Sequence, residues 1–112
     1  MGARGRVTPT EKLYAALRDR TWSEQELAWV LDLPVEMAAD LVRQPRITPS
    51  VTLRLEAALE ISAIDWYAAA GMPMPDFWQL KEQMAGELAA IRRRRYRLSH
   101  DRQEEGPRAP ST

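Results

Sequence analysis

Apolar residues recur every three or four positions along most of the chain, from Thr8 to Leu98. This spacing predicts amphipathic helices, because one helical turn takes 3.6 residues. Leu13, Tyr14 and Leu17 give an early example of such an apolar face. We find no stretch with the strict alternation of apolar and polar residues that a half-buried strand would show. The pattern therefore predicts an all-α fold.

Residues that favour helix ends divide this pattern into separate helices. Thr8 and Thr48 each precede a proline, and Ser23 stands three positions before a glutamate; both arrangements are typical of helix N-termini. Pro34 indicates the end of one helix and the start of the next, because the residue before a proline disfavours helical torsions. We expect five short helices over residues 8–71.

Four further segments complete the expected organisation. Residues 1–7 are expected to form a flexible basic arm, and Met72–Pro75 a short rigid joint. A long helix is expected over residues 76–98, packed on the five-helix body or in a dimer contact. Residues 99–112 are polar, and we expect a disordered tail there. The apolar stripe of the long helix consists of Phe77, Leu80, Met84, Leu88 and Ile91.

The composition removes several kinds of chemistry. The chain has 112 residues, no cysteine and one histidine, His100. Without cysteine there are no disulfides, thiolate zinc sites or cysteine nucleophiles, and a lone histidine disfavours histidine metal sites and catalytic triads. No apolar run reaches the roughly 20 residues of a membrane helix. We expect a cytoplasmic protein that stays out of membranes, is not an enzyme, and has no catalytic residue, cofactor or metal.

The charges balance overall but are unevenly distributed. Residues 1–22 carry a net charge of +3, residues 23–65 carry −5, and residues 92–98 carry +5. The last of these segments contains four consecutive arginines. Either they are solvated cations that favour a helix C-terminus, or they form a phosphate clamp together with Arg4 and Arg6.

Two of the expected helices, joined by a short turn before Pro34, form a helix-turn-helix arrangement. Residues 23–31 read Ser-Glu-Gln-Glu-Leu-Ala-Trp-Val-Leu, which resembles the Ser-Gln-x-Glu-Leu-Ala-x-x-Leu opening of Xre/Cro-type DNA-binding domains. Residues 47–66 carry an Ile-Thr-Pro…Leu-Arg-Leu…Ala-Leu…Ser…Trp series similar to that of HigA-type antitoxins, and residues 86–92 resemble the end of that group. The resemblance covers most of the chain.

This resemblance implies a fold and a function. The fold would be a five-helix Xre/Cro-like helix-turn-helix bundle over residues 8–71, followed by the long C-terminal helix. The function would be that of a bacterial or phage transcriptional regulator, a repressor or antitoxin-like protein that binds double-stranded DNA as a homodimer. A partner protein such as a toxin is also implied.

The resemblance also assigns positions at the DNA. In that family the helix after the turn enters the major groove, and a glutamine near the start of the preceding helix holds a phosphate. The phosphate position corresponds to Glu24, next to Gln25. The groove-facing positions correspond to Val35, Glu36, Met37, Ala39 and Asp40. Together with the arginines, the residues expected at DNA are Gln25, Val35, Glu36, Ala39, Asp40, Arg43, Arg46, Arg4, Arg6, Arg92, Arg93, Arg94 and Arg95.

Several of these positions depart from the family pattern. Family members usually carry hydrogen-bond donors there, whereas this chain carries two carboxylates, two apolar side chains and an alanine. A carboxylate about 5 Å from a phosphate costs roughly 1 kcal/mol in water and about 3 kcal/mol at an effective dielectric constant of 20. The glycine expected in the turn is replaced by Asp32, which tolerates left-handed torsions.

These departures favour an alternative function, a protein-interaction module on a helix-turn-helix scaffold that no longer reads DNA. Exposed tryptophan and methionine side chains are typical of such contacts, although the same residues would equally suit a core beneath a covering helix. The candidate partner surface consists of Trp29, Val30, Met37, Trp66, Phe77 and Trp78.

Overall fold

The computed structural model describes residues 8–105, and the side chains of residues 8–100. Residues 8–105 form seven helices and no strand, which confirms the predicted all-α class. The helices are α1 (Pro9–Arg20), α2 (Glu24–Leu31), α3 (Val35–Arg43), α4 (Pro49–Leu59), α5 (Ala63–Ala70), α6 (Trp78–Gln83) and α7 (Ala85–Glu105).

Short-range hydrogen bonds start three of these helices, as the sequence predicts. Thr8 and Ser23 each accept the main-chain N–H of the glutamate three residues later over 3.2 Å, and that glutamate accepts the N–H of its cap residue. Thr48 accepts the Val51 N–H over 3.3 Å at the start of α4. These bonds satisfy N–H groups that the first turn of a helix leaves free.

Left-handed backbone ends four of the helices in the described part of the chain. The φ angles are 56° at Thr21, 62° at Asp32, 60° at Glu60 and 70° at Gly71. Asp32 therefore takes the torsions expected of the turn residue, although it has a side chain. The chain then passes through Pro34, whose carbonyl accepts the first main-chain hydrogen bonds of α3.

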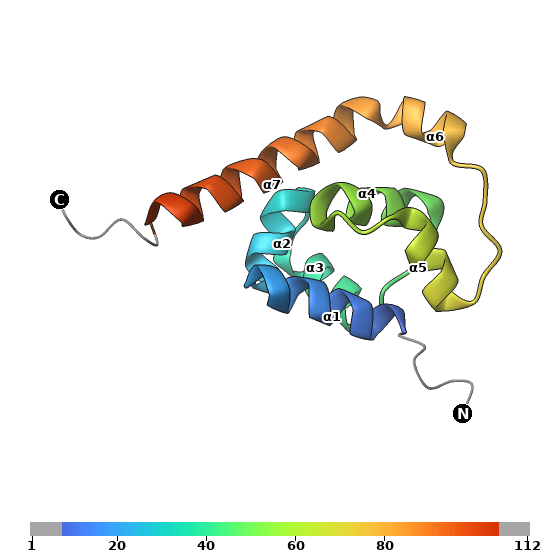
Figure 1. The fold of residues 1–112 in the computed structure, drawn as a ribbon, viewed down its shortest axis with the longest axis horizontal. Helices are drawn as coiled ribbons and strands as arrows, with labels where there is room; N and C mark the ends of the chain where they lie inside the picture. The colour runs from blue at the N-terminus through green and yellow to red at the C-terminus, as the bar shows by residue number, and fades with distance from the viewer. Residues whose placement is uncertain (1–7, 106–112) are drawn as a thin grey trace.

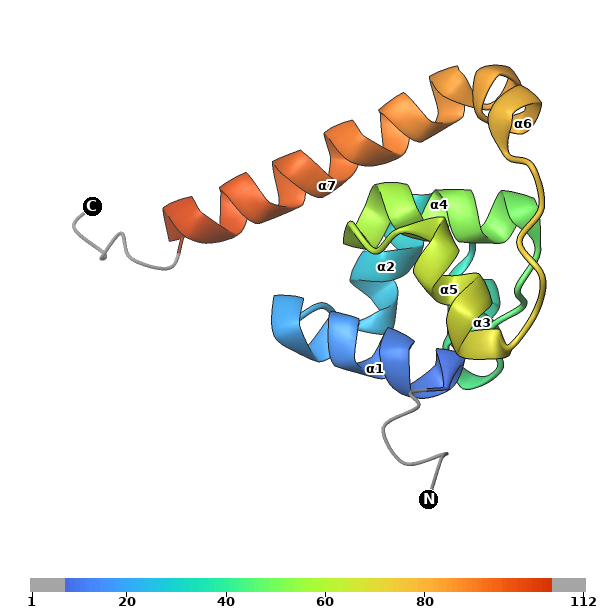
Figure 2. The same cartoon turned by 45° about the vertical axis from the view of Figure 1, so that its right-hand side comes forward.

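Helices α1 to α5 surround one apolar core (Figures 1 and 2). Leu13, Leu27 and Leu55, from α1, α2 and α4, are completely buried. Leu53 of α4 is buried as well. Trp66 of α5 lies at the centre with no exposed surface, and its Nε1–H has no hydrogen-bond partner among the described residues.

Tyr67 joins α5 to the segment before α6. Its ring lies edge-on to Phe77, with 5.7 Å between the ring centroids. Burial raises the pKa of Tyr67 above its ordinary value of 10.0, and a side-chain hydrogen bond with Thr52 partly opposes the rise. The hydroxyl of Thr52 also lies within 2.9 Å of the Thr48 carbonyl oxygen, inside the first turn of α4. The contacts of Tyr67 with Phe77 and Thr52 therefore hold the segment before α6 against α4 and α5.

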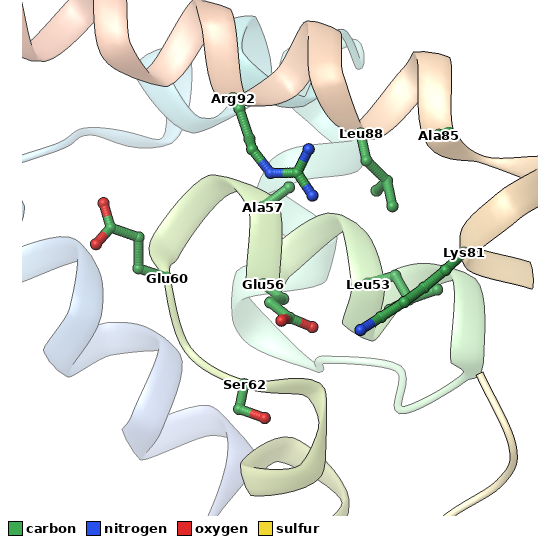
Figure 3. A pocket seen from close by; sticks show the side chains of 9 residues that line it. All are labelled: Leu53, Glu56, Ala57, Glu60, Ser62, Lys81, Ala85, Leu88 and Arg92. Carbon is green, nitrogen blue, oxygen red and sulfur yellow. The ribbon is translucent and has the colours of Figure 1, made fainter. Parts of the chain in front are cut away.

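The last two helices lie across one side of the body. Figures 1 and 2 show α7 passing along α2 and α4, with its C-terminal half extending beyond them. Met84, Leu88 and Ile91 are buried against the core, as the predicted stripe requires. Between α4 and the pair α6–α7 the side chains leave a pocket of about 420 Å³ (Figure 3).

Two boundaries predicted near the C-terminus are wrong. The single helix expected over residues 76–98 is interrupted at Met84, where the chain bends so that α6 and α7 both contact α4. The helix also continues to Glu105, so residues 99–105 are helical and not a disordered tail. No glycine or proline occurs between Gly86 and Gly106, so the sequence offers no strong signal that would end the helix earlier.

The predicted basic arm, with Arg4 and Arg6, and residues 106–112 lie outside the described residues. Within the described part, no helix is long and apolar enough to cross a membrane. The same part of the chain contains no group of three or more histidine, cysteine, aspartate or glutamate residues placed to hold a metal ion.

Candidate nucleic-acid interface

Helices α2 and α3 form a pair joined by a turn of three residues. The N–H of Leu33 reaches back 2.9 Å to the carbonyl of Ala28, which fixes the end of α2. Ala38 and Val42 face inward from α3 and have 0% and 1% of their surface exposed. The opposite side of α3 is therefore directed outward.

The outward side of α3 carries most of the residues expected at DNA. Val35, Glu36, Asp40 and Arg43 are exposed, and Ala39 is half-buried. From the neighbouring segments, the expected residues Glu24, Gln25 and Arg46 are exposed as well. Apart from the half-buried Ala39, the residues expected at DNA from α2, α3 and the loop after α3 are therefore exposed.

This surface is acidic near the turn and mixed in charge at the far end of α3. Glu24, Asp32 and Glu36 are exposed carboxylates. Asp40 accepts a hydrogen bond from the guanidinium of Arg43, three residues later. Both side chains of this ion pair are well exposed, at 64% for Arg43 and 70% for Asp40, so the pair stabilises α3 only slightly and can exchange partners.

A basic pocket of about 520 Å³ lies at the C-terminal end of α3. Three arginines line it: Arg43 from α3, Arg46 from the following loop, and Arg54 from α4. Val51 contributes an apolar wall, and Asp40 is the carboxylate among the lining residues. Three guanidinium groups from three successive segments therefore converge beside the exposed face of α3.

Arg54 is a member of this pocket that the sequence analysis missed. It is paired with Glu87 of α7, with 2.7 Å between Arg54 Nε and Glu87 Oε2. The available signal was its position three residues after Val51, which places both side chains on one face of α4. The sequence does not show that this face of α4 lies beside the end of α3; that follows only from the packing of the two helices.

The four consecutive arginines divide between two roles. Arg94 donates from Nε to the carbonyl oxygen of Val30 over 2.8 Å, and Arg95 donates from Nη1 to that of Ala57 over 2.8 Å. Both side chains are half-buried, so they are directed into the body. Arg92 and Arg93 are exposed.

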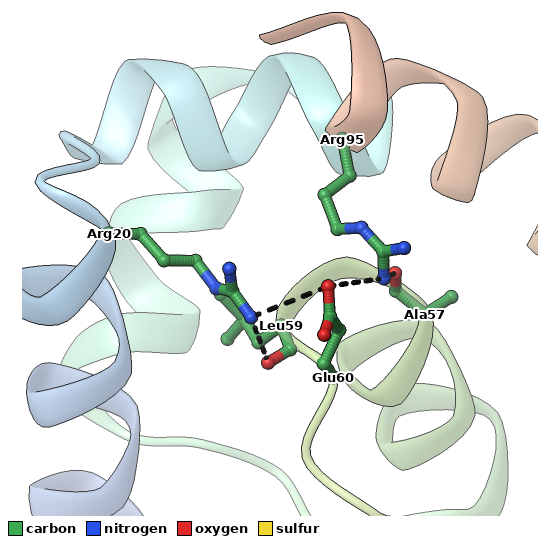
Figure 4. A network of polar contacts seen from close by, with 5 residues as sticks. All are labelled: Arg20, Ala57, Leu59, Glu60 and Arg95. Carbon is green, nitrogen blue, oxygen red and sulfur yellow. Dashed lines mark hydrogen bonds and ion pairs between the residues drawn. The ribbon is translucent and has the colours of Figure 1, made fainter. Parts of the chain in front are cut away.

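Arg95 belongs to a polar network at the C-terminal end of α4 (Figure 4). Arg20 of α1 donates to the Leu59 carbonyl over 2.7 Å, and both arginines approach the carboxylate of Glu60, at 3.8 Å and 3.4 Å. The last carbonyl groups of a helix carry partial negative charge, which these cations stabilise. Arg94 and Arg95 thus serve the folded body and lie outside the candidate interface.

Two residues of the predicted partner surface are wrongly placed by the sequence analysis. Val30 and Trp66 each have 0% of their surface exposed, because both face the shared core and not the solvent. Phe77 is half-buried. The exposed members of that set, Trp29, Met37 and Trp78, have exposed fractions of 45%, 54% and 67%.

The exposed basic side of α7 lies away from α3. Figures 1 and 2 show α7 and α3 on opposite sides of α2. Arg92, Arg93 and Arg97 are exposed on α7, beside Tyr96, whose ring stacks on His100 with 5.6 Å between centroids. These arginines and the pocket of Arg43, Arg46 and Arg54 therefore form two separate basic surfaces.

Comparisons with protein-family models, curated proteins and solved structures find no match to this chain.

Proposed function

We propose that the protein is a bacterial or phage transcriptional regulator of the Xre/Cro helix-turn-helix type, which binds double-stranded DNA through α2, α3 and the loop after α3. One observation carries the proposal: the exposed face of α3 ends at a pocket lined by Arg43, Arg46 and Arg54. A helix fits the major groove, and arginines at its end reach the phosphates beside the groove.

The side chains of α3 suit a limited set of base contacts. Glu36 and Asp40 can accept hydrogen bonds from cytosine amino groups, and Val35 and Met37 can contact thymine methyl groups. Arg43 can leave its exposed ion pair with Asp40 for a phosphate, because such surface pairs contribute only about 0–1 kcal/mol. The base contacts would select a sequence, and the arginines would supply most of the affinity.

The carboxylates at Glu24 and Glu36 reduce that affinity. Each carboxylate costs roughly 1 to 3 kcal/mol if it lies about 5 Å from a phosphate. Three arginine–phosphate contacts give a slope of about −2.7 when the logarithm of the binding constant is plotted against the logarithm of the salt concentration. The proposal therefore expects DNA binding that is weak at physiological salt and falls steeply as salt is raised.

The proposal includes an oligomeric state, the homodimer. Helix-turn-helix regulators generally bind two half-sites as a homodimer. The exposed side chains of Met72, Met74 and Trp78, with 45%, 50% and 67% exposed, lie together in sequence around the start of α6 and are the apolar residues suited to a contact between two copies.

Fluorescence polarisation with a labelled duplex from the DNA upstream of the gene tests the proposal. We expect binding at about 50 mM salt that weakens about 40-fold by about 200 mM, as a slope of about −2.7 requires. The double variant Arg43→Ala/Arg46→Ala lowers the salt slope by about 2, and the exposed arginine variant Arg93→Ala leaves it unchanged. Absence of binding at low salt, or an equal loss in Arg93→Ala, contradicts the proposal.

A second candidate function is binding to another protein, such as a toxin, through the same helix pair. The specific observation is the exposure of Trp29, Val35 and Met37, at 45%, 43% and 54%, on either side of the turn. Buried tryptophan and methionine contacts are typical of the centres of protein interfaces. Co-expression with the product of the adjacent gene tests this: a complex that Trp29→Ala and Met37→Glu both leave intact excludes it.

A further inference from the structure

The pocket between α4 and the pair α6–α7 has walls of different chemistry (Figure 3). Its volume of about 420 Å³ lies within the range of small-molecule sites. Leu53 and Ala57 of α4 and Leu88 of α7 provide an apolar wall, and each has less than 5% of its surface exposed. Lys81 and Arg92 stand above this wall.

Lys81 and Arg92 are the two cations of the pocket. Figure 3 shows both side chains directed into the space over α4, Lys81 from α6 and Arg92 from α7. Neither side chain makes a hydrogen bond or an ion pair with another described side chain, and both line the same cavity. The cations are therefore available to a ligand.

The carboxylates of the pocket are already used within the protein. Glu56 Oε1 accepts the main-chain N–H of Ala63 over 3.3 Å. Glu60 is shared by Arg20 and Arg95. The lining residues carry two carboxylates and two cations, but both carboxylates are engaged within the protein, which leaves Lys81 and Arg92 as the charged groups that a ligand can bind.

We propose that this pocket binds a small aryl carboxylic acid, with its carboxylate between Lys81 and Arg92 and its ring on Leu53, Ala57 and Leu88. Charge-assisted hydrogen bonds to two cations would fix the orientation, and the apolar wall would contribute the remaining affinity. The ligand would contact α4, α6 and α7 together. None of these residues belongs to the α2–α3 surface, so the site is independent of the proposed DNA binding.

Titrations followed by ¹⁵N–¹H NMR of the full chain test the proposal, with phenylacetate, 3-phenylpropionate and 4-phenylbutyrate as probes. We expect amide shifts at Ala57, Lys81 and Leu88, with a dissociation constant of about 1 mM or lower. Phenylacetamide lacks the negative charge and acetate lacks the ring. Each should bind at least about tenfold more weakly than phenylacetate, the loss expected for one charge-assisted hydrogen bond or for a small apolar surface.

Arg92→Ala and Lys81→Ala each weaken binding about tenfold, and Arg93→Ala, one position along α7, changes it less than about twofold. All three positions are exposed, so these variants fold. The proposal is overturned if none of the three acids shifts the pocket amides at about 20 mM, or if phenylacetamide binds as tightly as phenylacetate. It is also overturned if the shifts occur at Tyr96 and His100 instead.

Discussion

Arg94 donates a hydrogen bond from Nε to the carbonyl oxygen of Val30 over 2.8 Å, although 64 residues separate them along the chain. The next residue, Arg95, makes the equivalent bond to Ala57. Val30 lies in the last turn of α2, and Ala57 in the last turn of α4. Two adjacent side chains of α7 therefore complete the C-terminal ends of two different helices.

The first prediction concerns this pair of bonds. Arg94→Ala should lower the free energy of unfolding by about 1–2 kcal/mol, because it leaves the carbonyl of the buried Val30 without its charged donor. Urea denaturation measures the change. Arg93→Ala, the adjacent exposed position, serves as the control and should stay within about 0.5 kcal/mol of the parent protein. An equal effect of the two variants would mean that the Arg94 bond does not stabilise the fold.

The second prediction concerns the left-handed turn between α2 and α3. Asp32 has a φ of 62° and is exposed, so Asp32→Gly should raise the free energy of unfolding by about 0.5–1 kcal/mol. Gly71 provides the reverse test. It has a φ of 70° with open space around the position of a Cβ atom, and Gly71→Ala should cost about 1 kcal/mol through backbone strain alone. Thermal or urea denaturation that gives the opposite sign for either variant contradicts this account.

The third prediction separates the two candidate functions of the α2–α3 surface. Asp40→Asn removes a carboxylate from α3 and releases Arg43 from its ion pair. If α3 binds DNA, affinity at low salt should rise about fivefold, the effect of roughly 1 kcal/mol of repulsion removed. Fluorescence polarisation measures it, with Asp19→Asn, an exposed position on α1, as the control. Unchanged or weaker DNA binding in Asp40→Asn would count against groove docking by α3.

The fourth prediction is a pH dependence of stability. Burial raises the pKa of Tyr67, so the folded state holds the phenol proton more tightly than the unfolded chain, whose phenol titrates near 10.0. The stabilisation is fully present below pH 10 and is lost as the pH rises through the higher pKa of the folded protein. Tyr67→Phe lacks this titration.

Urea denaturation at a series of pH values between about 8 and 11 distinguishes the two proteins. The parent protein should lose more stability than Tyr67→Phe over the alkaline part of this range. Parallel curves for the two proteins would show that Tyr67 does not titrate differently in the folded and unfolded states.

The sequence predicted well the features that depend on neighbouring residues. The caps at Thr8, Ser23 and Thr48 involve bonds over three positions, and all three are present. The left-handed torsion at Asp32, which is also present, was expected from the resemblance, because that pattern places a glycine in the turn. Such signals are contained in a few consecutive residues and need no knowledge of the packing.

Features that depend on distant segments were not predictable in the same way. The bend at Met84 serves contacts of α6 and α7 with α4, and the only local signal near it is Gly86, two residues later, which by itself does not indicate a bend. Helical spacing from Leu88 and Ile91 could place Arg94 and Arg95 on the inner side of α7, but not identify the carbonyl oxygens they meet. The contribution of Arg54 to the basic pocket also depended on how α4 packs.

The bonds of Arg94 and Arg95 restrict how the length of α7 can change. One residue inserted between Ile91 and Arg94 would rotate everything after it by about 100° around the helix axis. Both guanidinium groups would then leave their carbonyl oxygens, and the ends of α2 and α4 would be open to water. Substitutions on the outer side of α7 should therefore be tolerated far better than insertions or deletions within residues 88–95.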